Sequence, residues 1–330
     1  MFSAVSIGGG CGAVQVLLGL RKHTANLTGI IAVTDTGRST GKVRSLANIP
    51  APGDVRNALG TLAGDDTTFA KLIQHRMLVP KSEQLNGVAF GNLMLAALTQ
   101  MSGDFGEAVN AMRQMLGVDI RILPVTTHNT HICAELVDGT MIAEELNVRA
   151  LGKPDIKRVF IQDRMARAYA PCVDALLGAD LITIGPGSLF TTVLACLAFD
   201  EVSQAIQKSP AKTVYVCNNT TQPGQTDGFT LADHVDQVKT YLNGRLDYVL
   251  LNTRAPSDAL RMAYQRDGVE VLLPTDDEVK RIEKMGPKVI VRDLAQLTEG
   301  KRDLFDKQDS IRHDPDTLGA ALMEILNEEV

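Results

Sequence analysis

A glycine-rich turn near the start of the chain constrains the fold more than any other feature. Phe2–Ile7 form a short β-like apolar run, Gly8-Gly9-Gly10-Cys11-Gly12 form the turn, and the apolar residues of Ala13–Lys22 have helical spacing. Gly8, Gly10 and Ala13 match G-x-G-x-x-[GA], in which small residues let the backbone and a helix N-terminus approach a phosphate. The pattern predicts an α/β protein that binds a nucleotide or phosphate here; a turn without a ligand is the alternative.

The rest of the chain alternates short apolar runs with amphipathic stretches, which is typical of a parallel sheet covered by helices. We therefore predict a single three-layer α/β domain over residues 1–330, with a modified Rossmann-type, doubly wound, mostly parallel sheet. A β-rich insertion is expected at about residues 118–165, where three β-like runs lack this alternation. Those runs are Asp119–Val125, Ile132–Val137 and Arg158–Ile161. Further strands are predicted at Leu27–Thr34, Leu181–Ile184, Thr213–Cys217, Tyr248–Leu251, Val269–Leu273 and Val289–Val291.

Composition excludes several classes of partner. The net charge of the 330 residues is −6, which gives no reason to expect nucleic acid or anionic lipid as a partner. No apolar run approaches the roughly 20 residues that span a bilayer, so no membrane contact is expected. The five cysteines are scattered, and the chain does not open on a basic segment followed by a long apolar stretch. We expect a cytoplasmic protein without a signal peptide.

Two polar segments follow the second predicted strand. Asp35 ends that strand, where an acidic residue can reach a ribose hydroxyl, and it opens a predicted loop through Lys42. Arg38, Ser39 and Thr40 in this loop suit a second phosphate or a sugar, unless the loop is only solvated. The next segment carries Gly53, Asp54 and Asn57. Asp54 is interpreted either as the N-cap of a helix or as a metal or sugar ligand, with Asn57 as a polar contact.

Two later turns are expected at the same edge of the sheet. Gly185-Pro186-Gly187-Ser188 joins a predicted strand to a helix, and a polar loop containing Asn218, Gln222 and Thr226 follows the next strand. Ligands of open α/β sheets bind at the carboxyl ends of the strands. Backbone amides and hydroxyls from both turns would therefore face a ligand bound at the first turn.

In order, these segments resemble the motifs of the CofD/YvcK family, the 2-phospho-lactate transferase and gluconeogenesis-factor superfamily. Cys11 takes the threonine place of the family's GGGTG turn. The other matching segments are Val33–Arg44, Pro50 or Pro52 to Asn57, Gly91-Asn92-Leu93, Ala179–Thr192, Thr221–Thr226, Asp233-His234 and Ile311-Arg312-His313-Asp314. The resemblance spans almost the whole chain. It implies that Asn92 and Arg312 join the ligand-binding residues of the other motifs.

The resemblance implies one of two functions. The transferase branch moves a phospholactyl group from a nucleoside diphosphate carrier to a deazaflavin with Mg²⁺. The YvcK-like branch binds UDP-sugars such as UDP-N-acetylglucosamine and regulates carbon metabolism and cell shape or cell wall. We favour the second branch because the TGRSTG, GPGSLFTT, TQPGQT and IRHD elements look more like it. The aromatic content of 4% also disfavours a pocket that stacks a flat tricyclic acceptor.

Catalysis is left open by the sequence. An enzyme of this family would transfer phosphorus-containing groups, with Asp35 and Asp54 as candidate catalytic residues and Mg²⁺ ligands. Thr34 precedes a single aspartate where the family often has two acidic residues, which argues against a metal. The first turn alone is also typical of NAD(P)-dependent oxidoreductases. A homo-oligomer is left open as well.

Overall fold

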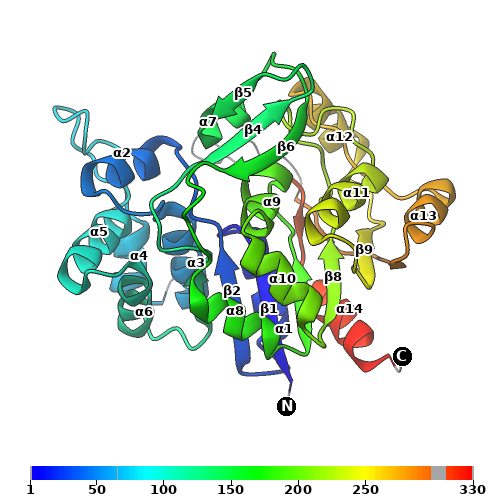
Figure 1. Ribbon diagram of the computed structural model, residues 1–330, viewed down its shortest axis with the longest axis horizontal. Helices are drawn as coiled ribbons and strands as arrows, with labels where there is room; N and C mark the ends of the chain where they lie inside the picture. The colour runs from blue at the N-terminus through cyan, green and yellow to red at the C-terminus, as the bar shows by residue number, and fades with distance from the viewer. Residues whose placement is uncertain (1, 65, 299–309, 329–330) are drawn as a thin grey trace.

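The computed structural model describes residues 2–64, 66–298 and 310–328 and is built around a seven-stranded sheet (Figure 1). Its strand order is β10-β9-β8-β7-β1-β2-β3, and every neighbouring pair is parallel. The strands are β1 (Ser3–Gly8), β2 (Asn26–Ile31), β3 (Arg121–Pro124), β7 (Leu181–Ile184), β8 (Lys212–Val216), β9 (Tyr248–Asn252) and β10 (Lys288–Arg292). The predicted doubly wound parallel sheet is confirmed.

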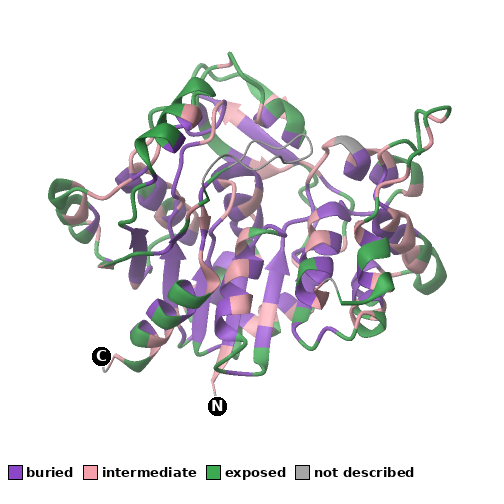
Figure 2. Cartoon of the chain, turned by 180° about the vertical axis from the view of Figure 1, so that it is seen from behind, coloured by how far each residue is buried: buried purple, intermediate pink, exposed green. Residues whose placement is uncertain are grey.

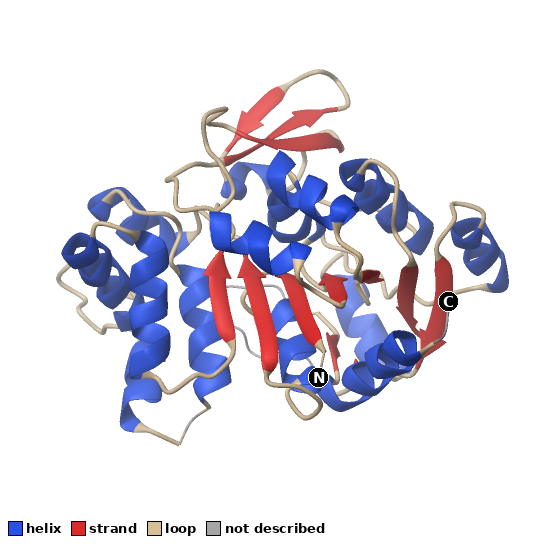
Figure 3. Cartoon of the chain, turned by 60° about the horizontal axis from the view of Figure 1, so that its bottom comes forward, coloured by secondary structure: helices blue, strands red, loops and turns tan. Residues whose placement is uncertain are grey.

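Two helical layers cover the faces of this sheet (Figures 1 and 3). The first contains α1 (Gly12–Leu20), α3 (Gly53–Ala63), α6 (Phe105–Met115) and α14 (Pro315–Asn327). The second contains α8 (Ala170–Leu177), α10 (Asp200–Lys208), α11 (Leu231–Leu242) and α13 (Asp276–Glu283). Because both faces are covered, the inner strands are buried over most of their length and are mainly coloured as buried in Figure 2.

The strand order reverses between β1 and β7. The chain proceeds from β1 to β2 in one direction and from β7 to β8 in the other, while Ile7 of β1 pairs with Ile184 of β7. The connections leaving these two strands must diverge, which opens a crevice at their carboxyl ends. The first glycine turn and the turn at Gly185–Ser188 both lie at this point.

A small antiparallel sheet lies over the carboxyl edge of the main sheet, at the top of Figure 1. Its order is β5-β4-β6, from β4 (Ile132–Leu136), β5 (Met141–Ala143) and β6 (Ile156–Ile161), with the short helix α7 (Glu145–Val148) between them. We call residues 132–161 the cap. The Tyr241 hydroxyl of α11 bonds both the N–H and the C=O of Val159 in β6, at 2.6 and 2.7 Å, and so joins the cap to the main body.

The remaining elements connect these layers. They are α2 (Arg38–Ala47), α4 (Thr68–Gln74), α5 (Phe90–Ser102), a π-helical turn (Leu189–Val193) that leads into α9 (Leu194–Leu197), α12 (Asp258–Arg266), β11 (Ala295–Gln296) and β12 (Arg312–His313). Among the described residues, no single helix has the length and apolarity to cross a membrane. Only the bent pair Leu189–Leu197 and Asp200–Lys208 meets that test when both helices are taken together.

The middle of the chain differs from the prediction. The run Asp119–Val125 was assigned to the insertion at about residues 118–165, but its strand β3 pairs in parallel with β2 in the main sheet. Arg121 is exposed at the start of β3, whereas Ile122 and Leu123 are buried under α6. Helices α2 to α6 separate β2 from β3, so the long crossover hides the βαβ rhythm in the sequence.

Two local predictions after β2 are also wrong. The loop expected from Asp35 to Lys42 is short, because α2 already begins at Arg38; this polar helix is held in place by burial of Val43 and Thr40. Asp54 is not a helix N-cap, because α3 begins at Gly53 after Pro52 and Asp54 lies in its first turn. A carboxylate in the first turn is favourable to the helix without accepting a capping bond.

The strand predicted at Val269–Leu273 does not form. Only Val271 makes a single antiparallel bridge, to Thr220 in the loop after β8. The segment is held by this loop and not by the main sheet, where β10 occupies the place beside β9. Val269 is buried against Leu260 and Tyr264 of α12, Val271 packs partly on the same cluster, and Leu272 is buried in the main core.

Candidate functional site

The first glycine turn packs directly against the turn after β7. A Cβ atom on Gly12 would overlap the carbonyl oxygen of Pro186, and one on Gly8 would lie 3.3 Å from the same oxygen. The first turn leads into α1, whose N-cap residue Cys11 is exposed and makes no side-chain cap bond. Two backbone turns and one helix N-terminus therefore meet at the β1–β7 crevice, an arrangement that suits an anion.

The start of α3 closes the other side of the turn. The Asn57 side-chain amide donates to the carbonyl of Gly10 at 3.0 Å and lies 3.2 Å from the Cys11 sulfur. A Cβ atom on Gly10 would overlap the Asp54 backbone, and one on Gly9 would lie 2.7 Å from Asp54 Oδ2. Asp54 thus brings a carboxylate beside the turn, and Asn57 fixes the turn's conformation.

The predicted segment from Asp35 to Lys42 contains half-buried residues, such as Asp35, and buried residues, such as Ser39 and Thr40. Asp35 Oδ1 accepts a bond from the Gly37 N–H at 2.7 Å, and the Thr40 hydroxyl packs against Gly53 at the start of α3. Ser39 is buried and accepts from Arg76 at 3.3 Å. The backbone of Arg38 begins α2, but its side chain lies outside the described part of the structure.

Asn92 contacts Ser39 of this segment and Arg56 of α3. Its side chain is fully buried, donates to Ser39 Oγ at 3.5 Å and accepts from Arg56 Nε at 3.4 Å. Burial, with the nearby Arg76, lowers the pKa of Arg56 to about 10, although Asp54 opposes the shift. Asn92 therefore holds Ser39 and Arg56 in place from the protein interior.

The turn after β7 is tied to the loop after β8. The Asn218 amide donates to the Gly187 carbonyl at 2.8 Å, and the Ser188 hydroxyl donates to Gln225 Oε1 at 3.0 Å. Within the loop, the Gln222 N–H donates to the Thr226 hydroxyl at 2.8 Å. Thr226 is buried, so it shapes the loop.

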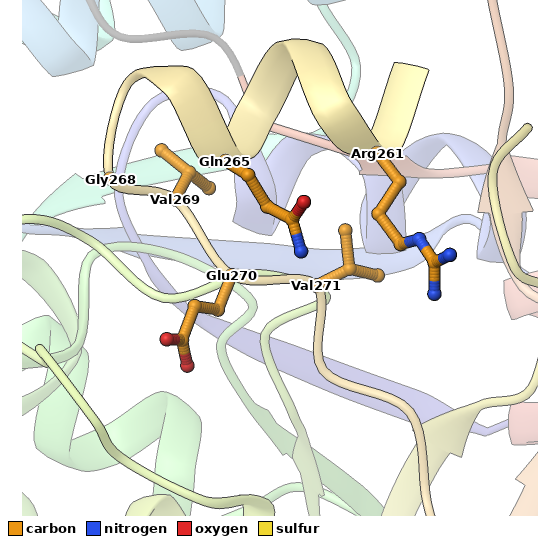
Figure 4. A pocket seen from close by; sticks show the side chains of 6 residues that line it. All are labelled: Arg261, Gln265, Gly268, Val269, Glu270 and Val271. Atoms are coloured by element: carbon orange, nitrogen blue, oxygen red, sulfur yellow. The ribbon is translucent and has the colours of Figure 1, made fainter. Parts of the chain in front are cut away.

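Arg312 belongs to a neighbouring group of contacts at the end of β8. The preceding residue, Ile311, accepts a bond from the Asn219 amide at 3.2 Å, while Arg312 is half-buried and pairs through its backbone with Gln296. A surface pocket of about 440 Å³ lies near this region (Figure 4). It is lined by Arg261, Gln265, Gly268, Val269, Glu270 and Val271.

The cap contributes two charged residues that the sequence analysis missed. Arg149 forms an ion pair with Glu145 at 2.7 Å, and the Glu145 side chain is 5% exposed. Burial lowers the pKa of Arg149, but Glu145, Asp35 and Asp54 outweigh it, so the net shift is upward. A Cβ atom on Gly37 would lie 3.1 Å from Asp35 Oδ1 and 3.6 Å from Glu145 Oε2, so the Glu145–Arg149 pair lies beside Asp35. The i,i+4 spacing of Glu145 and Arg149 was visible in the sequence, but not the position of the cap.

The assembled site combines backbone amides, hydroxyls, two carboxylates and the Arg149 guanidinium. Such a set binds phosphate oxygens through N–H groups and the cation, while carboxylates accept from sugar hydroxyls. Gly8–Gly12, Asp54, Asn57, Gly185–Ser188 and Asn218 come together at the crevice, with Asp35 beside the Glu145–Arg149 ion pair. Asn92 bonds Ser39 and Arg56, and Arg312 follows Ile311, whose carbonyl accepts from Asn219. The arrangement suits a nucleoside diphosphate.

Comparisons with known proteins cover nearly the whole chain. Residues 4–295 match the family described as 2-phospho-L-lactate transferase CofD. The chain is 36% identical over 322 residues to the Gluconeogenesis factor of Bacillus subtilis (strain 168), covering 97% of each protein. It is 32% identical over 323 residues to the Gluconeogenesis factor of Halalkalibacterium halodurans, covering 98% of this chain and 96% of that protein.

A solved structure gives the same result for the fold. The crystal structure of a UPF0052 family member from Bacillus halodurans superposes with a TM-score of 0.88 at 31% identity. It covers 98% of this chain and 100% of that chain. Because so little is left uncovered, the likeness includes the main sheet and the cap together.

Proposed function

This chain belongs to the CofD family, and on that premise we propose that it is a gluconeogenesis factor that binds a nucleotide-sugar. The nucleotide-sugar is of the UDP-N-acetylglucosamine type, and its diphosphate lies at the carboxyl ends of β1 and β7. The protein regulates carbon metabolism and cell shape through this ligand. The relatives' printed name and the resemblance of the motifs support the proposal.

The convergence of the turns after β1 and β7 is the observation that carries the proposal. Gly12 contacts Pro186, Asn57 holds Gly10, and Asn218 holds Gly187, so four separate segments shape the same backbone surface. A surface of backbone amides at a helix N-terminus favours a phosphate and does not require a particular base. The neighbouring polar loop after β8 offers amide groups for the sugar.

Phospholactyl transfer is the second candidate, and the positions of Asp35 and Asp54 favour it. Among residues 2–64, 66–298 and 310–328, no group of three His, Cys, Asp or Glu side chains is placed to hold a metal ion. Mg²⁺, however, commonly takes one or two carboxylates and completes its shell with substrate phosphates and water. Asp35 and Asp54 would hold Mg²⁺ in this way, and the ion would neutralise charge on the diphosphate.

A thermal-shift panel tests the proposal against its alternatives. UDP-N-acetylglucosamine, UDP, GDP, NAD and NADP are each added at saturating concentration, with and without Mg²⁺. The proposal predicts that the UDP-sugar raises the unfolding temperature most, since a ligand at 100 times its Kd stabilises by about 2.7 kcal/mol. No shift with any UDP-sugar would reject it. Mg²⁺-dependent release of GMP from a GDP-type phospholactate donor, in the presence of the deazaflavin, would favour the transferase.

A further inference from the structure

The cap segment from Glu145 to Lys153 crosses the crevice. At one end the Leu146 N–H donates to Thr36 Oγ1 at 3.3 Å, in the loop after β2. At the other end the Lys153 ammonium donates to the Gly224 carbonyl, in the loop after β8. Strands β2 and β8 flank the β1–β7 pair in the strand order. A segment that contacts both of these loops must pass over the two turns between them.

Arg149 lies in the middle of this crossing segment. Its side chain is 37% exposed, and its Nη1 group donates to Glu145 Oε1 at 2.7 Å. Among the residues that the structure describes, Glu145 is the acceptor for the Arg149 guanidinium. The Nε and Nη2 groups of Arg149 therefore remain as donors for a ligand. A guanidinium presents its donors in a planar fork that matches two oxygens of a phosphate.

Two other described arginines of the region, Arg44 and Arg56, have their guanidinium groups bonded to the protein. Arg44 is 3% exposed and bonds Asn129 Oδ1 at 2.7 Å and the carbonyl of Thr130 at 2.5 Å. Arg56 bonds the side chains of Asn92 and Gln74. These two buried cations also lie close to Asp35 and Asp54, respectively, and offset their charges. Arg149, by contrast, is 37% exposed, and its partner Glu145 lies beside Asp35.

We propose that Arg149 is the cation with which the cap binds the diphosphate, and that Glu145 is its positioning residue. The inference rests on the proposed function and deepens it, because it assigns recognition of the ligand's charge to the cap. The turns of the main sheet supply neutral backbone donors, and Arg149 of the cap supplies the positive charge. A second phosphate should therefore add more affinity than the sugar does.

The test measures the affinities of UDP and UMP for the full chain by calorimetry. Arg149→Ala should weaken UDP binding by about 10- to 100-fold, the usual loss for a hydrogen bond to a charged group. UMP binding should change less, and Arg149→Lys should recover part of the UDP affinity. A general distortion of the site would weaken both ligands equally, and that result would overturn the inference.

Arg158→Ala is the matched control on the same cap. Arg158 is 60% exposed and contacts Glu135 at 2.6 Å and the Phe160 ring, both within the cap, so UDP affinity should be unchanged. Glu145→Gln should weaken UDP binding in the wild-type background and have no further effect in the Arg149→Ala background. An equal loss in both backgrounds would overturn the positioning role.

Inorganic pyrophosphate separates this inference from the proposed function. Arg149-dependent binding of pyrophosphate without any binding of UDP-N-acetylglucosamine would reject the nucleotide-sugar and keep Arg149 as the phosphate ligand. Binding of UDP-N-acetylglucosamine that Arg149→Ala leaves unchanged would reject Arg149 and keep the proposed function. Absence of binding by both ligands would reject both proposals.

Discussion

Gly12 and Pro186 are in direct backbone contact, so that any side chain at Gly12 would overlap the Pro186 carbonyl oxygen. The two residues are 174 positions apart along the sequence (186 − 12) and belong to the turns that leave β1 and β7. This contact lies at the crevice where the strand order reverses. The geometry of the candidate site therefore depends on how closely two turns approach each other.

Gly12→Ala should separate these turns and lower both stability and ligand affinity. Overpacking of this kind costs about 1–3 kcal/mol, which urea unfolding at constant temperature would measure. Gly178→Ala is the control, because a Cβ atom there would meet only the carbonyl oxygen of Asp174, at 3.5 Å. Equal stability of the Gly12 and Gly178 variants would contradict the close contact.

Tyr241→Phe should loosen the cap without changing the main sheet. The hydroxyl accepts from the Val159 N–H and donates to its carbonyl, and loss of such a pair costs about 1–2 kcal/mol. Hydrogen exchange should therefore become faster for the amides of β6, and the Val159 amide should respond most. Tyr248→Phe, whose hydroxyl contacts Glu328 at 3.3 Å far from the cap, should leave β6 exchange unchanged. Unaltered exchange in the Tyr241 variant would exclude this attachment.

His313 should make stability depend on pH between about 4 and 6.5. Burial lowers the pKa of its imidazole to about 4, below the ordinary value of 6.5, so the unfolded chain binds a proton more readily. The stabilisation is complete above pH 6.5 and is lost as the pH falls through 4.

The comparison of wild type with His313→Asn isolates this residue, because burial also lowers the pKa of His131 and His234. From pH 7 to pH 4.5, the free energy of unfolding of the wild type should fall by roughly 2–3 kcal/mol more than that of the variant. Parallel pH profiles for the two proteins would show that His313 is not protected from protonation in the folded state.

The sheet and the positions of its turns could be predicted because both depend on local patterns. Buried strands leave apolar runs, and the carboxyl ends of parallel strands share one edge, so the turns at Gly8 and Gly185 had to lie near each other. The failures depend on distant contacts. Helix α2 exists because Val43 and Thr40 are buried against other segments, and Val269–Leu273 looks apolar because it packs on α12 and on the main core.

The cap residues could not be predicted for the same reason. Glu145 and Arg149 form an ordinary i,i+4 pair in the sequence, and nothing local shows that they lie over the crevice. Their position depends on the bonds from Leu146 to Thr36 and from Tyr241 to Val159. These contacts join residues 110 and 82 positions apart. The sequence therefore predicts the part of the site on the main sheet but not the part on the cap.

Calorimetric titration with UDP-N-acetylglucosamine tests the central claim most directly. The account predicts saturable binding of the intact nucleotide-sugar by the wild-type protein, and loss of that binding in Gly12→Ala while circular dichroism shows the variant folded. The absence of saturable heat with the wild type would contradict the claim. So would the same affinity in a folded Gly12→Ala protein, because the diphosphate would then lie elsewhere.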